Sequence, residues 1–171
     1  MKVLSILILT ITIFYGQIIQ FDTYKADFIQ NITNNSNNTI KYKGTIYIDN
    51  KSNILWEYKK PIEKKVYLKD HRVYIVEPEL EQVIISDMDK ELNLIDIINS
   101  SKQISKDKYQ NSINNTTYNI TIKNNILQKI DYIDNIDNKI EIIFLNTHKN
   151  ITIPKKIFKF KIPADYDIIQ K

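Results

Sequence analysis

The chain has 171 residues, of which 43% are hydrophobic and 26% charged, and this length and composition suit one folded globular domain. It has no cysteine, which excludes disulfides, thiolate metal sites, cysteine nucleophiles and a lipid-modified N-terminal cysteine. The formal net charge of +4, which the removal of Lys2 would lower further, is too small to predict binding to nucleic acid.

The N-terminus predicts an export signal. Lys2 is followed by an apolar stretch of about 13 residues, whereas a transmembrane helix needs about 20. Gly16 offers a small residue for cleavage, although Phe14 occupies a position where a small residue is preferred. We expect a signal peptide over residues 1–16 and a single mature domain over residues 17–171, with an uncleaved N-terminal anchor as the alternative.

Beyond residue 23, apolar and polar residues alternate as they do in strands with one buried face. β-Branched and aromatic residues dominate these runs, as a pleated, half-buried surface prefers. The expected strands cover residues 40–49, 54–59, 65–69, 139–144 and 158–162. Short turn signals, such as those at 34–38, 70–71 and 124–125, separate sequential strands. The chain is therefore predicted to form hairpins within one long antiparallel sheet.

One segment, residues 86–99, breaks the alternation. It opens with capping residues and with acids in its first turn, which favour the start of a helix. Leu94, Ile95 and Ile98 share one helical face, and neighbouring apolar residues broaden it. The segment predicts one short helix that must cover an apolar surface.

No pattern of reactive residues predicts an enzyme. The two histidines, His71 and His148, stand in turn contexts far apart in the sequence. The aspartates within 131–137 lack the spacing and the glycine of a calcium loop, and the alternating glutamates within 77–81 predict an exposed strand face. Two glycines provide neither a phosphate-binding loop nor a nucleophile elbow. We expect no catalytic residue, no metal and no cofactor.

Several motifs follow one another in a defined order. A Phe-x-Gln ends residues 21–30, a glycine precedes an apolar pair within 42–48, and Trp-Glu-Tyr-Lys-Lys-Pro covers 56–61. Spaced Asp, Tyr, Pro and Gln-Val residues follow within 70–83, and a Phe-x-Phe-x-x-Pro motif closes the chain at 158–163. In this order and spacing they resemble the LolA family of outer-membrane lipoprotein carrier proteins over almost the whole mature chain.

The chain departs from the family pattern near the tryptophan. The family commonly has Arg-Pro where this chain has Asn50-Lys51, and Leu55 replaces an arginine often found just before the tryptophan. Where an arginine on this strand latches the lid, this chain must use another group, for which Lys41, Lys43 or Arg72 are candidates.

The resemblance implies a mainly β fold: a strongly curved, incomplete antiparallel β-barrel with a short α-helical lid. It also implies a monomeric periplasmic chaperone that carries acylated lipoproteins from the inner to the outer membrane. An inner-membrane ABC transporter would load it and an outer-membrane lipoprotein receptor would unload it. Because the chain has no N-terminal cysteine for an anchor, we expect the soluble carrier and not an anchored receptor.

The carrier would hold acyl chains in a cavity on the apolar sheet face. The expected cavity wall consists of Phe28, Ile46, Ile48, Ile54, Trp56, Tyr58, Val66, Leu68, Val73, Ile75, Ile142 and Phe144. The expected underside of the lid consists of Leu92, Leu94, Ile95 and Ile98. At each position the alternative is a solid packed core. Two other functions stay open: a binding protein for free lipid, glycolipid or fatty acid, and an interaction protein with a filled core and pairing edge strands.

Overall fold

The computed structural model describes residues 18–171, apart from 50, 52 and 88–92. The predicted signal peptide over 1–16 and the predicted lid residue Leu92 lie outside the described residues. None of the helices in the described part of the chain has the length and apolar character needed to span a membrane.

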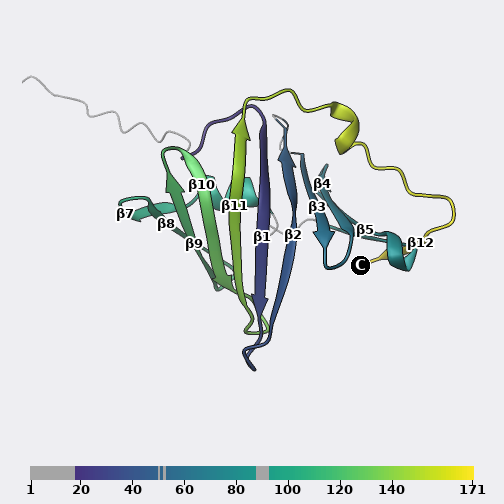
Figure 1. The fold of residues 1–171 in the computed structure, drawn as a ribbon, viewed down its shortest axis with the longest axis horizontal. Coiled ribbons are helices and arrows are strands. Elements are labelled where there is room, and N and C mark those ends of the chain that lie inside the picture. Colours follow the sequence, from purple (N-terminus) through teal and green to yellow (C-terminus); the bar gives the residue numbers. More distant parts are fainter. Residues whose placement is uncertain (1–17, 50, 52, 88–92) are drawn as a thin grey trace, which may run out of the picture.

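The described residues form one open, curved sheet of twelve strands (Figure 1). The strands are β1 (Tyr24–Thr33), β2 (Thr39–Ile48), β3 (Ile54–Lys60), β4 (Lys64–Lys69), β5 (Arg72–Glu77), β6 (Gln82–Asp87), β7 (Lys102–Ser105), β8 (Lys108–Ile113), β9 (Thr116–Lys123), β10 (Ile126–Ile133), β11 (Lys139–Lys149) and β12 (Asp167–Gln170). Their order in the sheet is β12-β6-β5-β4-β3-β2-β1-β11-β10-β9-β8-β7, and the two edges do not meet. Every pair is antiparallel except β12 with β6, which is parallel. The predicted fold class is confirmed.

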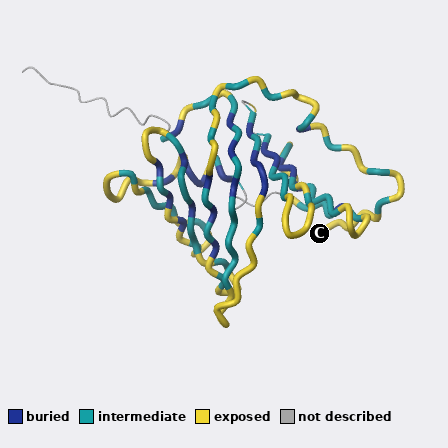
Figure 2. Tube along the Cα trace, in the orientation of Figure 1, coloured by how far each residue is buried: buried dark blue, intermediate teal, exposed yellow. Residues whose placement is uncertain are grey.

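The period-two pattern gives the sheet two unlike faces. One face carries the main core, in which residues of β9 and β10 pack with residues of β3, β4 and β5. These strands are far apart in the sheet order, so they can meet only across a concave interior. The opposite face carries a smaller cluster around Leu55, Tyr67 and Phe158. Figure 2 shows the buried positions gathered in the strands and the exposed positions gathered in the hairpin turns.

The turns follow their sequence signals. Two-residue turns at 70–71, 114–115 and 124–125 have φ between 47° and 68° at both positions, the backbone of the type I′ hairpin. In the longer turns at 34–38 and 134–138, the first side chain accepts hydrogen bonds from the backbone N–H groups two and four positions later. Asparagine, aspartate and histidine, the residues at these positive-φ positions, are the non-glycine residues that adopt this backbone most often, which explains why glycine is not needed there.

The predicted strand over 158–162 is wrong. A 3₁₀ helix, η3 (Lys155–Phe158), stands there, and no strand follows until β12. The Phe-Lys alternation arises because Phe158 and Phe160 both dock on the outer sheet face, where the Phe160 ring lies 5.4 Å from Tyr67 and 5.0 Å from Tyr74. Figure 1 shows this segment crossing outside the sheet to reach β12.

Three local predictions also need correction. The helix does not open at Ser86, which belongs to β6; helix α1 spans Leu94–Asn99. The glutamates within 77–81 do not share a strand face, because Pro78 starts a 3₁₀ helix, η1 (Pro78–Leu80), after β5. His148 lies in strand β11 and not in a turn.

Gly44 stands where the sheet leaves no room for a side chain. It pairs with Phe28, and a Cβ at this position would lie 2.7 Å from Cζ of the Phe28 ring and would collide with the Glu57 carbonyl oxygen. We predict that Gly44→Ala lowers the free energy of unfolding by about 1–3 kcal/mol, since the core must shift to accept the methyl group. Urea unfolding of the mature chain measures this, with Lys43→Ala at the exposed neighbouring position as the control. Equal midpoints for the two variants would contradict the close approach.

Candidate functional site

The twelve predicted cavity residues all lie in the core of the concave face. Seven of them line a cavity of about 270 Å³ between the sheet and helix α1: Trp56, Tyr58, Val66, Leu68, Val73, Ile75 and Ile142. Ile48 lines a second hollow near the helix. The remaining four, Phe28, Ile46, Ile54 and Phe144, line neither space and pack in the solid part of the core. The same face therefore combines a filled region with an open one.

Aromatic contacts fix one wall of the cavity. The Phe28 ring packs edge-on against Trp56 and Tyr58, with 5.0 Å between ring centroids in both pairs. Trp56 also lies 6.2 Å from Phe144 on the far side of β1. Such tilted pairs add about 0.5–1.5 kcal/mol each to the burial of the rings. Phe28 is thus the support behind the two aromatic rings that face the open space.

The cavity has one polar end. Tyr58 donates a hydrogen bond of 3.0 Å to Gln30 Oε1, and both residues line the cavity. Burial raises the pKa of Tyr58, so this hydroxyl keeps its proton at neutral pH. Strands β1 and β3 begin, at Tyr24 and Ile54, near the end that the helix covers. Gln30 and Tyr58 come later in these strands and so lie toward the opposite end.

Helix α1 covers the other end. Asn93 caps it by accepting hydrogen bonds from the N–H groups of Ile95 and Asp96. Leu94 and Ile97 reach the cavity, and Ile98 is buried beside them. The predicted lid residues Leu94, Ile95 and Ile98 thus lie on the side of the helix that meets the core. Ile97, which the sequence pattern predicted to broaden the apolar helical face, was not among the expected lid residues, yet it also borders the cavity.

A side chain of β8 holds the end of this helix. Asn111 Nδ2 donates to the Ile97 carbonyl oxygen at 3.1 Å and to Ser100 Oγ at 2.8 Å. The three cations proposed as substitutes for the latching arginine, Lys41, Lys43 and Arg72, are exposed on β2 and β5. In the described part of the chain, the side-chain hydrogen bonds that join α1 to the sheet therefore come from Asn111.

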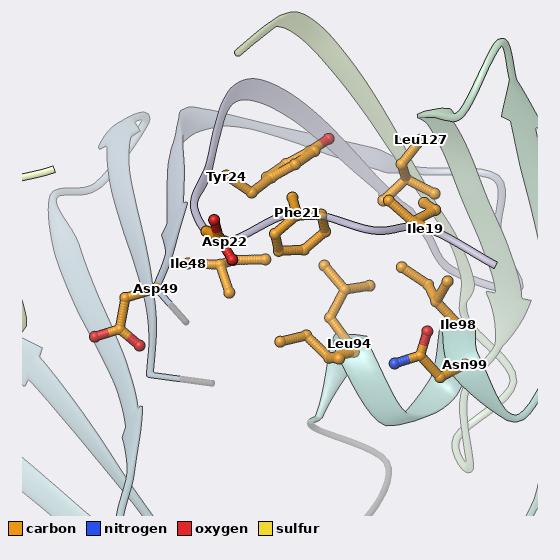
Figure 3. Close-up of a pocket in the computed structure, with 11 residues that line it drawn as sticks. Ile19, Phe21, Asp22, Tyr24, Ile48, Asp49, Leu94, Ile98, Asn99 and Leu127 are labelled. Carbon is orange, nitrogen blue, oxygen red and sulfur yellow. The ribbon is translucent and has the colours of Figure 1, made fainter. Parts of the chain in front are cut away.

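A second hollow of about 190 Å³ lies between α1 and the segment before β1 (Figure 3). Ile19 and Phe21 from this segment face Leu94 and Ile98 of the helix, with Asp22, Asp49 and Asn99 at the polar rim. Ile19 is only 5% exposed. The sequence prediction missed this cover, although the Ile18-Ile19-x-Phe21 pattern after the expected cleavage site could have indicated it.

Hydrogen bonds tie this N-terminal segment to the loop after β11. Asn150 Oδ1 accepts from the Asp22 backbone N–H at 2.8 Å, and Thr23 Oγ1 donates to the Ile151 carbonyl oxygen at 2.6 Å. Next to them, burial raises the pKa of Tyr24 to about 12 although its hydroxyl is paired with Thr147. The segment is therefore an anchored part of the wall.

The site suits an apolar ligand held by shape. Its walls are mostly aliphatic and aromatic, with few polar groups to fix an orientation. Among the residues that the structure describes, no three histidine, cysteine, aspartate or glutamate side chains gather to hold a metal ion.

Comparisons with known proteins agree with this geometry. The family model described as outer membrane lipoprotein carrier protein LolA matches residues 20–98. An outer-membrane lipoprotein carrier protein of Campylobacter jejuni is 36% identical over 162 residues, covering 92% of this chain and 95% of the relative. Another, from Wolinella succinogenes, is 30% identical over 150 residues, covering 87% of each chain.

One solved structure supports the fold alone. The crystal structure of an uncharacterized conserved protein from Thermus thermophilus matches with a TM-score of 0.53 at 9% identity, covering 87% of this chain and 90% of that one. The sequence relatives, by contrast, span nearly the full chain at an identity that establishes kinship. The chain belongs to the LolA family of outer-membrane lipoprotein carrier proteins.

Proposed function

We propose that this protein carries acylated lipoproteins across the periplasm, holding their acyl chains against the concave face of the sheet. The observation that carries the proposal is the unfilled cavity between that face and helix α1. Relatives that match most of the chain and are named as lipoprotein carriers support the cargo class. In this proposal residues 1–16 are a signal peptide, and residues 17–171 are the carrier domain.

The energetics explain why a carrier is needed. An acyl chain of about 15 methylenes loses about 0.8 kcal/mol for each methylene exposed to water, on the order of 12 kcal/mol for the chain. A lipoprotein therefore cannot cross an aqueous compartment unaided. A cavity of 270 Å³ is small for several chains, so we infer that α1 and the N-terminal segment move outward as cargo enters.

The proposed partners follow from the direction of transport. An inner-membrane ABC transporter would load the carrier, and an outer-membrane receptor would accept the cargo. Transfer makes and breaks no covalent bond, so the role needs neither catalysis nor a cofactor. The second candidate, a binding protein for a free lipid, glycolipid or fatty acid, is favoured by the same apolar cavity.

A release assay tests the proposal. Inner-membrane vesicles from the same organism, carrying labelled lipoprotein, are mixed with the purified mature chain and ATP. We expect labelled lipoprotein in the soluble fraction as a one-to-one complex with the chain. No release with the organism's own transporter would overturn the carrier proposal and leave free-lipid binding as the better one.

Val66 gives a test of the cavity itself. This half-buried residue lines the cavity, whereas its neighbour Lys65 points to the opposite face and is exposed. We predict that Val66→Asn weakens retention of an acylated peptide about tenfold, because an apolar contact is replaced by a desolvated amide. Lys65→Asn is the matched control and is expected to bind as the wild type does. Equal binding by both variants, with both folded by circular dichroism, would place the acyl chain elsewhere.

Asn111 gives a test of the lid. Its two hydrogen bonds to the end of α1 contribute about 1 kcal/mol each, so Asn111→Ala is expected to raise the population of the open state about thirtyfold. Stopped-flow uptake of an apolar fluorescent dye should then be faster than in the wild type. Ser112→Ala, on the exposed side of the same strand, should not change the rate. Unchanged uptake in Asn111→Ala would show that the helix is not the gate.

A further inference from the structure

Lys64 stands at the polar end of the concave face. It lies on β4 two and four positions before Val66 and Leu68, so the strand alternation places all three on the side that lines the cavity. On β3 its partner is Tyr58, a residue of the cavity wall. The Lys64 Nζ atom lies 4.5 Å from the centre of the Tyr58 ring and 5.2 Å from that of Tyr42.

In the part of the chain that the structure describes, this cation has aromatic neighbours and no ion pair. Within the described residues, no carboxylate oxygen lies within 4.0 Å of Lys64 Nζ, in contrast to Lys65, which pairs with Glu57 at 3.3 Å. Burial lowers the pKa of Lys64, whereas the charge of Glu77 opposes that shift. Two ring faces stabilise the ammonium only in part, since such contacts contribute about 0.5–2 kcal/mol.

The nearby carboxylate is held by another group. Glu77 follows Ile75 on the same face of β5, but its Oε2 atom accepts a hydrogen bond from Gln82 Nε2 on β6. Gln30 likewise accepts from Tyr58. Lys64 therefore keeps its N–H donors beside Tyr58, a residue of the cavity wall, while Glu77 and Gln30 accept hydrogen bonds from other groups.

We propose that Lys64 binds the head group of a single-chain lipid carboxylate, a free fatty acid, whose hydrocarbon chain lies along the cavity toward helix α1. A carboxylate matches the single charge of Lys64, whereas the more highly charged phosphate group would meet stronger repulsion from Glu77. The cavity of about 270 Å³ suits one chain better than two. The inference rests on the proposed function in one respect, because it needs a cavity that accepts an acyl chain. It adds free fatty acids to acylated lipoproteins as a second class of ligand.

The test uses the only tryptophan of the chain as its probe. Trp56 lines the cavity, so its fluorescence reports occupancy directly. The mature wild type is titrated at neutral pH and low salt with decanoate, decan-1-ol and decylammonium, which share a chain and differ in head-group charge. We expect decanoate to bind about tenfold more tightly than decanol, and decylammonium to bind more weakly than decanol.

The variants locate the preference. Lys64→Gln should bind decanoate and decanol with equal affinity, while decanol binding stays near the wild-type value. Lys65→Gln, which removes a neighbouring lysine from the opposite face of the same strand, should keep the preference for decanoate. Equal binding of decanoate and decanol by the wild type, or a preference that survives in Lys64→Gln, would overturn the head-group inference.

The same titrations separate this inference from the carrier proposal. Decanol binding without a decanoate preference leaves the acyl cavity intact and removes only the role of Lys64. Failure of all three amphiphiles to bind overturns the fatty-acid inference and also the use of this cavity for acyl chains. A decanoate preference together with a negative release assay supports the inference and makes the free lipid the physiological ligand.

Discussion

The structure depends on one constraint: a single open sheet must bury an apolar concave face without a second sheet to cover it. Curvature brings β9 and β10 opposite β4 and β5, which buries most of that face against itself. The edges do not join, so the curve cannot tighten into a filled barrel. Helix α1 and the segment around Ile19 cover one end, and the uncovered remainder is the cavity. The cavity thus exists because the sheet does not close completely.

The period-two pattern predicted the sheet because burial on one face forces alternation, and turns rich in asparagine and aspartate marked the hairpins correctly. The pattern failed where alternation had another cause. At Phe158 and Phe160 two aromatic rings dock on the outside of the sheet, and a docked loop produces the same spacing as a strand. The parallel pairing of β12 with β6 could not be predicted either, because paired residues such as Gln82 and Asp167 are far apart in the sequence and helix α1 and strands β7 to β11 lie between them.

The sequence pattern could predict which residues face inward, but not which of them border open space. Alternation identified which residues face inward, and all twelve do. It could not tell filled from open space, because Phe28 and Val66 carry the same signal while only the second borders the cavity. Whether a residue borders open space depends on how side chains from distant strands fill the concave interior, and the local sequence does not record those contacts. The attachment of α1 by Asn111 was similarly hidden, since an asparagine among many gives no local signal.

The burial of Ile19 links the leader cleavage that we propose to the shape of the ligand site. This side chain closes the mouth together with Phe21 and α1, and it lies three residues beyond the proposed end of the leader. A peptidase that cut after Ile19 would remove part of the wall. In the processing that we propose, the position of the cut therefore decides whether Ile19 and Phe21 remain to complete the binding surface.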